Sequence, residues 1–255
     1  MVGGAASVLA ISRARAAALA IAAALLVVYV AVAESLWDLP SGDDALVVGL
    51  LVLPAFTALI WLALPLWRSP FPYLLFGGVI LVGCWIVLDA IGIDSLANVV
   101  KLASFAALGF WLLSLFDELW WVALVALLIP WVDAWSVATG PTRYVTHEQP
   151  GFFEHVSVAF PLTGEASSIN MGPPDVIFFA LFLAAADRFR LRVGWTWIGM
   201  TGCLALTVGL VWWLADSGLP ALPAIALGFL VPNADRIWRH VQGARRARRE
   251  LESAK

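Results

Sequence analysis

The sequence contains few charged residues. Asp, Glu, Lys and Arg make up 13% of its 255 residues, about half of the quarter that is usual in soluble globular domains. Apolar residues make up 62%, and a water-soluble fold of this size could not cover that much apolar surface with polar groups. The composition therefore excludes a soluble globular domain. It also excludes a disordered chain, because disorder requires low hydrophobicity.

Cysteine is nearly absent. Cys84 and Cys203 are the only two, and both lie inside apolar runs. This excludes a disulfide framework and a paired-cysteine metal motif. Both residues are therefore predicted to be small buried hydrophobic side chains.

Two motifs of membrane-embedded proteases are also missing. No His-Glu-x-x-His sequence is present, which argues against a zinc protease, because that motif places two histidine ligands on one helix face. His147, Glu148 and His155 lack this spacing and are expected to be solvated loop residues. No Gly-x-Ser-Gly sequence is present either, which argues against a rhomboid-like serine protease.

Long apolar runs dominate the chain. A helix needs about 20 apolar residues to cross the hydrocarbon core of a bilayer. Backbone polar groups inside lipid must be satisfied within the segment, so helices are the expected structure. We predict an all-α, polytopic transmembrane helical bundle of about eight spans. These spans are residues 14–33, 45–67, 71–90, 97–116, 119–139, 173–190, 194–215 and 219–235.

Lys and Arg gather on one side of these eight spans. Cytoplasmic loops of membrane proteins carry an excess of these two residues. The cytoplasmic positions are then Arg13, Arg15, Arg68, Arg188, Arg190, Arg192 and the tail 236–255. The opposite side carries mainly acids. We therefore expect a multi-pass protein of the cell membrane with a cytoplasmic C-terminal tail.

The two ends of the chain each allow two interpretations. The basic tail is interpreted as an anchor on anionic membrane lipid, and not as a nucleic-acid site. At the other end, Arg13, Arg15 and the apolar run up to Ala33 could form a cleaved signal peptide. The run is longer than a usual signal core, which favours an uncleaved span.

One connection is long. Residues 140–172 are rich in glycine, proline and small polar residues, which are typical of loops. Their middle part, 152–160, partly alternates and predicts a short hairpin or strand. The chain is thus divided into N-terminal helices 1–118, a second helical group 119–235 that includes the outward loop 140–172, and the basic tail 236–255.

Acidic residues within predicted spans are costly in lipid and are functional candidates by default. Those at span ends are expected to reach water, and they are Asp89, Asp117, Asp187 and Asp216. Asp133 and Asp175 differ from them. Asp133 lies about two helical turns before the Gly-Pro break at 140–141, and Asp175 lies at the start of the next span. Both acids therefore fall near the same membrane face at similar depth.

Contact between these two helices would let the two carboxyls meet. Two carboxyls that are close together in a poorly solvated site cannot both ionise, so the pair holds a single proton. The ionised member can take a proton from water while the protonated member donates to a carbonyl, which is general acid–base hydrolysis of a peptide bond. The alternative is that Asp133 and Asp175 are two interfacial acids with separate water contacts.

At these residues the sequence resembles the presenilin and signal peptide peptidase family of intramembrane aspartyl proteases. That family carries Tyr-Asp on one helix, Gly-x-Gly-Asp on the next and Pro-Ala-Leu on the last. Residues 131–137 resemble the first motif, with Val132 in place of tyrosine. Residues 172–175 resemble the second, with Pro174 in place of the second glycine. Residues 220–223 match the third. The resemblance covers roughly residues 119–235.

The resemblance implies that Asp133 and Asp175 are the catalytic pair of an intramembrane aspartic endopeptidase. It also implies that the Pro-Ala-Leu segment shapes the active site and helps to place the substrate backbone. The residues implied in substrate binding are Gly172, Pro220, Ala221, Leu222 and Pro223. Prolines at this level leave backbone carbonyls open, and an extended substrate could dock on the loop 140–172 as an added strand.

The same resemblance implies transmembrane peptides or signal-peptide remnants as substrates, without a metal ion or an organic cofactor. An outward-facing pair resembles the orientation of signal peptide peptidase more than that of presenilin. Members of the family usually have nine spans, against the eight predicted here.

Three other interpretations remain. Prepilin peptidases use a similar aspartate pair and about eight spans, although they do not explain Pro-Ala-Leu on the last helix. A proton-coupled transporter or channel also uses buried acids and helices interrupted by proline, but the sequence has no sign of two matching halves. In an inert scaffold, the 14 tryptophans would be interfacial belts and packing residues.

Overall fold

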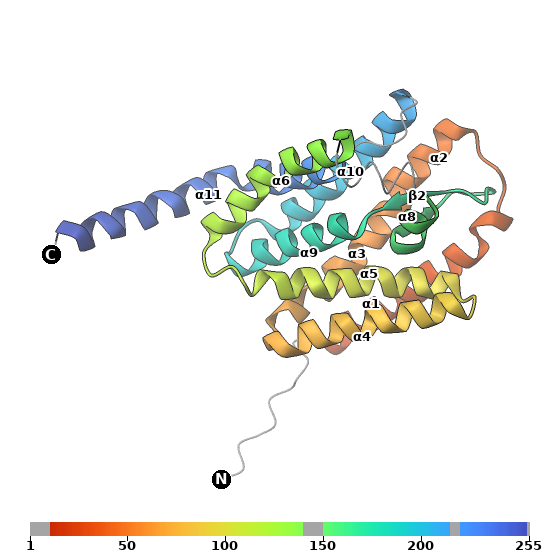
Figure 1. Ribbon diagram of the computed structural model, residues 1–255, viewed down its shortest axis with the longest axis horizontal. Coiled ribbons are helices and arrows are strands. Elements are labelled where there is room, and N and C mark those ends of the chain that lie inside the picture. The colour runs from red at the N-terminus through yellow and green to blue at the C-terminus, as the bar shows by residue number, and fades with distance from the viewer. Residues whose placement is uncertain (1–10, 140–149, 215–219, 254–255) are drawn as a thin grey trace, which may run out of the picture.

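A computed structural model describes residues 11–139, 150–214 and 220–253 of the chain. These ranges form a helical body with one small two-stranded hairpin, and a long C-terminal helix projects from it (Figure 1). The prediction of a nearly all-α fold is therefore confirmed for this part of the chain. The α-helices are α1 (Arg13–Val32), α2 (Ser41–Val47), α3 (Leu53–Ala63), α4 (Phe71–Ala90), α5 (Asp94–Leu113), α6 (Leu119–Thr139), α8 (Pro150–Val156), α9 (Pro173–Arg188), α10 (Val193–Leu214) and α11 (Leu222–Ser253).

Among the residues that the structure describes, six helical segments are long and apolar enough to cross a membrane. They coincide with six of the eight predicted spans and are compatible with a multi-pass membrane protein. The two other predicted spans are also helical but differ in length, since α9 has 16 residues and α11 has 32. The six segments are Arg13–Ser35, Gly42–Arg68, Phe71–Ala90, Asp94–Leu113, Leu119–Val137 and Val193–Leu214.

The second of these segments changes its winding along its length. It contains α2, a π-turn (Val48–Val52), α3 and a 3₁₀ turn (Leu64–Arg68). The π-turn lies immediately before Leu53 and Pro54. Because Pro54 has no N–H, it cannot donate to the carbonyl four residues earlier, and the helix must adjust around it.

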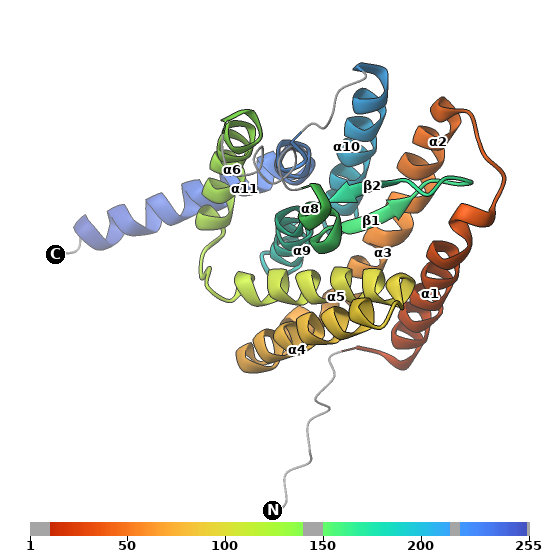
Figure 2. The ribbon, with the colours of Figure 1, turned by 45° about the vertical axis from the view of Figure 1, so that its right-hand side comes forward.

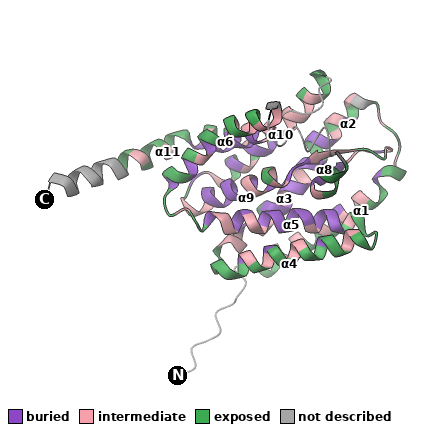
Figure 3. Ribbon diagram, in the orientation of Figure 1, coloured by how far each residue is buried: buried purple, intermediate pink, exposed green. Residues whose placement is uncertain are grey.

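Helix α9 forms the centre of the body. Its side chains from Phe179 to Ala186 are all buried, as is Val176. It contacts α5, α10 and α11, which surround it in Figures 2 and 3. A helix that is apolar on all sides is expected in such a central position.

Glycines allow two pairs of these helices to approach closely. A methyl group on Gly109 of α5 would overlap the carbonyl oxygen of Ile177 on α9 and would lie 2.8 Å from Cβ of Ala180. A methyl group on Gly228 of α11 would overlap the backbone of Met200 on α10. Small residues at such crossings are typical of helix pairs packed in membranes.

The predicted hairpin is present, but its extent differs from the prediction. Strand β1 (Val158–Pro161) pairs antiparallel with β2 (Ser168–Met171), so that Ala159 lies opposite Asn170. The start of the predicted strand, from Phe152 to Val156, is instead part of helix α8. The backbone N–H and carbonyl groups there form hydrogen bonds within the helix, and only the residues after Ser157 pair across strands.

Several predictions for single side chains need correction or fall outside the described ranges. Cys84 is exposed and Cys203 is only partly buried, so the prediction that both are buried is wrong. Both remain free thiols. Asp117 reaches solvent as expected, whereas Asp187 accepts hydrogen bonds from the side chains of Trp67 and Arg68. Residues 140–149, which include His147 and Glu148, and Asp216 lie outside the described residues.

Candidate functional site

Asp133 lies on α6, six residues before the end of the helix. Its side chain is partly buried. Oδ2 of Asp133 accepts a hydrogen bond of 3.1 Å from the backbone N–H of Leu222. This bond joins the carboxyl of α6 to the first residue of α11, across 89 positions of sequence.

Asp175 is the third residue of α9. The helix begins with Pro173 and Pro174, and proline is well tolerated there because the first N–H groups of a helix have no internal partner. Oδ2 of Asp175 accepts a hydrogen bond of 3.1 Å from the N–H of Gly172, and the N–H of Asp175 donates to the carbonyl of Gly172. This reciprocal pair fixes the carboxyl at the helix N-terminus, where the helix dipole favours negative charge.

Asp133 and Asp175 lie on helices that touch each other, because α6, α9 and α11 are all in mutual contact. Asp175 is also within electrostatic reach of Asp133. Two carboxyls that approach closely in a poorly solvated site share one proton and leave the other group as a base, and this is the chemistry that the arrangement would allow.

The Pro-Ala-Leu segment lies against Asp133. Leu222 is buried and begins α11, with Pro223 as the next helical residue. The carbonyl of Ala221 accepts a hydrogen bond from the N–H of Ile225 and so starts the helix. Pro220, Ala221 and Pro223 are partly buried. Of the five residues predicted to bind substrate, Leu222 contacts Asp133 and Gly172 contacts Asp175 directly.

Two polar residues of α5 hold the hairpin that leads to Asp175. No role was predicted for either of them from the sequence. The side chain of Asn98 donates to the carbonyl of Ala159 at 2.7 Å and accepts from its N–H at 2.8 Å, in the manner of a neighbouring strand. The ammonium of Lys101 donates to the carbonyl of His155. Both residues are buried, and a buried polar residue in an apolar span is the one sequence signal that marks them.

His155 and Asp89 complete this contact. Nδ1 of His155 lies 3.0 Å from Oδ2 of Asp89, and the ammonium of Lys101 lies 3.7 Å from Oδ1 of the same carboxyl. His155 is exposed as expected, but it lies on helix α8 rather than in a loop and pairs with Asp89. Asp89 lies at the end of α4 with a partly exposed carboxyl, as expected, and it also contacts Lys101 and His155. Together these side chains fasten α8 to the ends of α4 and α5.

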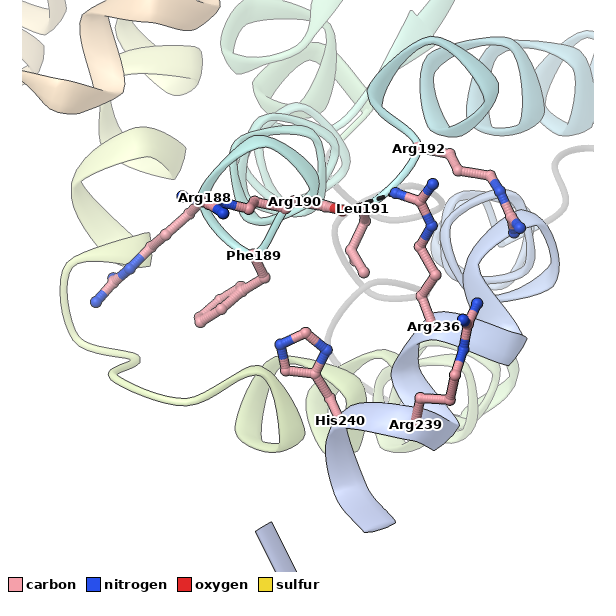
Figure 4. Close-up of a pocket in the computed structure, with 8 residues that line it drawn as sticks. All are labelled: Arg188, Phe189, Arg190, Leu191, Arg192, Arg236, Arg239 and His240. Atoms are coloured by element: carbon pink, nitrogen blue, oxygen red, sulfur yellow. Dashed lines mark hydrogen bonds between the residues drawn. The ribbon is translucent and has the colours of Figure 1, made fainter. Parts of the chain in front are cut away.

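A hollow of about 570 Å³ lies at the other end of α9. Five arginines and a histidine line it together with Phe189 and Leu191, and they come from the α9–α10 turn and from α11 (Figure 4). Asp235 pairs with two of the arginines, Arg192 and Arg239. Because α9 is about 24 Å long at 1.5 Å per residue, this basic hollow is well separated from Asp175. The basic residues are Arg188, Arg190, Arg192, Arg236, Arg239 and His240.

The chain matches no known protein-family model, no curated protein and no solved structure. Within the described ranges, neither Asp133 nor Asp175 belongs to a group of three or more side chains able to hold a metal ion.

Proposed function

We propose that this chain is an intramembrane aspartic endopeptidase that hydrolyses peptide bonds within transmembrane or signal-peptide segments. The main support is the packing around Asp133: its carboxyl on α6 accepts a hydrogen bond from the N–H of Leu222 at the start of α11, and both helices contact α9, which carries Asp175. These are the positions at which the sequence resembles presenilin and signal peptide peptidase.

The proposed reaction uses one shared proton. The ionised carboxyl removes a proton from water as the water oxygen bonds to the peptide carbonyl carbon, and the protonated carboxyl donates its proton to the carbonyl oxygen. When the C–N bond breaks, the proton taken from water passes to the leaving nitrogen, and the carboxyl that had donated its proton takes one back from a hydroxyl of the tetrahedral intermediate, which restores the single shared proton. Neither carboxyl is assigned permanently as acid or base, because the pair titrates as a unit.

The substrate is proposed to bind as an extended strand beside β2. In the described part of the chain the sheet has only two strands. The backbone of Ala159 faces Asn98, away from β2. Its partner Asn170 then also turns its N–H and carbonyl away from the sheet, because opposed residues in an antiparallel pair alternate together. The outer edge of β2 ends one residue before Gly172 and can accept a strand.

We also propose that α9 and the first part of α11 complete eight membrane-embedded helices, with the C-terminal tail in the cytoplasm. Helix α9, at about 24 Å, is shorter than a hydrocarbon core of about 30 Å. The hairpin precedes the N-terminus of α9 and would fill the part of the bilayer thickness that α9 does not span. Asp175, at the start of α9, would then lie below the membrane surface. The basic hollow would then face the cytoplasmic leaflet and contact anionic lipid headgroups.

The decisive experiment is cleavage of a labelled transmembrane peptide by the purified protein in detergent. We expect Asp133→Asn and Asp175→Asn each to lower the rate by about 10²–10⁴-fold, which is the usual contribution of general acid–base catalysis. Asp117→Asn is the matched control, because it makes the same change at an exposed acid, and it should cleave like the unmodified protein.

Cleavage that survives both substitutions would exclude the aspartate pair. Proton flux into liposomes without any cleavage would support a proton-coupled transporter instead. Cleavage confined to leader peptides that precede a soluble segment would support the prepilin-peptidase alternative.

A further inference from the structure

The turn of the β-hairpin rests on the connection between α1 and α2. Gly164 lies in this turn with φ of +77°, and its N–H donates a hydrogen bond of 2.8 Å to the carbonyl of Ala33. A methyl group on Gly164 would lie 2.5 Å from the backbone of Asp38. Figures 1 and 2 both place the tip of the hairpin beside this connection.

Three carboxylates converge at this contact. They belong to Asp38 in the connection, Asp44 on α2 and Glu165 in the hairpin turn, and one oxygen from each lies within 4.8 Å of the other two. None of the ion pairs found in residues 11–139, 150–214 and 220–253 involves any of them. Three negative charges are therefore held together without a cationic partner in that part of the chain.

Asp44 adds a second, independent observation. Its side chain is 2% exposed. Oδ1 accepts a hydrogen bond of 2.8 Å from the hydroxyl of Thr163, but Oδ2 is buried without any hydrogen-bond partner. A buried, unpaired carboxylate oxygen is strongly unfavourable unless a cation or a donor satisfies it. The fold holds the carboxylate that carries this oxygen within a group of like charges, which is the arrangement expected of a cation ligand.

We propose that Asp38, Asp44 and Glu165 bind a calcium ion. Carboxylate oxygens are hard ligands suited to Ca²⁺ or Mg²⁺. Two ligands of one ion are separated by at most twice the metal–oxygen distance, which is about 4.6–5.2 Å for Ca²⁺ and about 4.0–4.2 Å for Mg²⁺. Oxygens up to 4.8 Å apart lie within the span of the calcium shell and exceed that of the magnesium shell, so Ca²⁺ needs the smaller inward movement of the three carboxylates. Water would complete the six to eight ligands that Ca²⁺ takes.

Bound calcium would fasten the hairpin to the first two helices. The hairpin continues through β2 and Gly172 directly into α9 and Asp175, so the ion would restrain the segment that carries Asp175. This inference does not rest on the proposed protease, because binding and stability can be measured without any substrate.

The test measures thermal unfolding of the purified full-length chain in detergent, with either EGTA or CaCl₂, together with calorimetric titration of Ca²⁺. At 100 times the Kd, calcium should raise the Tm by about 5–10 °C. Asp44→Asn and Glu165→Gln should lose both the shift and the heat of binding. Asp43→Asn is the matched control, because Asp43 is the exposed neighbour of Asp44, and it should keep both.

Asp44→Asn has a further signature. In EGTA it should be at least as stable as the unmodified protein, because it removes a buried charge that has no partner without the ion. If this variant does not fold, Glu165→Gln in the hairpin turn carries the same test.

Three results would overturn the proposal: equal Tm values in EGTA and CaCl₂ with no heat of binding, retention of both responses in Glu165→Gln, or equal losses in Asp43→Asn and Asp44→Asn. An equal response to Mg²⁺ would overturn the choice of calcium.

Discussion

The N–H of Leu222 donates a 3.1 Å hydrogen bond to Oδ2 of Asp133 and so ties the start of α11 to α6. Leu222→Pro removes this donor while proline remains acceptable at the first position of a helix. Hydrogen bonds to charged groups contribute about 1.5–3 kcal/mol, so the rate of peptide cleavage should fall by about 10–100-fold. Leu222→Ala keeps the N–H and loses the buried side chain, and it should retain more activity than Leu222→Pro. Equal losses in both variants would assign the effect to packing alone.

The outer edge of β2 offers a second test. Asn170→Pro removes the outward N–H of Asn170 without removing a hydrogen bond between β1 and β2, and proline is accepted on sheet edges. If substrate binds there as a strand, KM should rise several-fold because the hydrogen bond from the N–H of residue 170 to the substrate backbone is lost. Asn170→Ala keeps the N–H but loses the side-chain contact with Ser157, so it controls for that contact. An unchanged KM in the proline variant would place the substrate elsewhere.

Asn98 should be a main support of the hairpin. Asn98→Ala leaves both backbone groups of Ala159 without their partners, at a cost of about 1–3 kcal/mol for each buried group. We expect a lower free energy of unfolding and faster hydrogen exchange over 158–171. Ser114→Ala is the control at the residue that follows α5, because Ser114 is exposed and its hydroxyl donates to the nearby carbonyl of Trp111. Unchanged exchange in Asn98→Ala would contradict this role.

The crossing of α5 and α9 should not tolerate a methyl group. Gly109→Ala would force the side chain against Ile177 and Ala180, and overpacking of this kind costs about 1–3 kcal/mol. Denaturant unfolding in detergent should show this loss. Gly83→Ala on α4, where nothing lies within 4 Å, should instead be neutral or slightly stabilising through helix propensity.

The orientation of the chain can be read by cysteine labelling in intact cells. After Cys84 and Cys203 are replaced by alanine, Ala166→Cys in the hairpin turn should react with a membrane-impermeant maleimide without lysis. Gln242→Cys on the tail should react only after lysis. Both positions are exposed in the fold. Any difference in their reaction with the maleimide therefore reports the side of the membrane on which each lies. The reverse pattern would overturn the cytoplasmic tail and the outward-facing aspartates.

The sequence predicted most of the helices, because a bilayer imposes a simple length and polarity rule that each segment must meet on its own. Six of the eight predicted spans correspond to helical segments of spanning length. The contact between α6 and α9, which carry Asp133 and Asp175, could also be expected, since one acid precedes a Gly-Pro break and the other opens the following span.

Contacts between distant polar groups could not be predicted in this way. The bond from Asn98 to Ala159 spans 61 positions, and the one from Leu222 to Asp133 spans 89. Nothing in the local pattern of either residue specifies its partner. The same holds for Asp44, whose neighbour Asp43 looks identical in sequence but is exposed, while Asp44 is buried beneath the hairpin turn.

Helix α11 has one further consequence. It runs for 32 residues, or about 48 Å, from the donor beside Asp133 to a basic end that stands clear of the helical body (Figure 1). Pro232 lies inside the helix, where proline removes one backbone hydrogen bond. The basic tail and the N–H that bonds Asp133 therefore belong to one continuous helix.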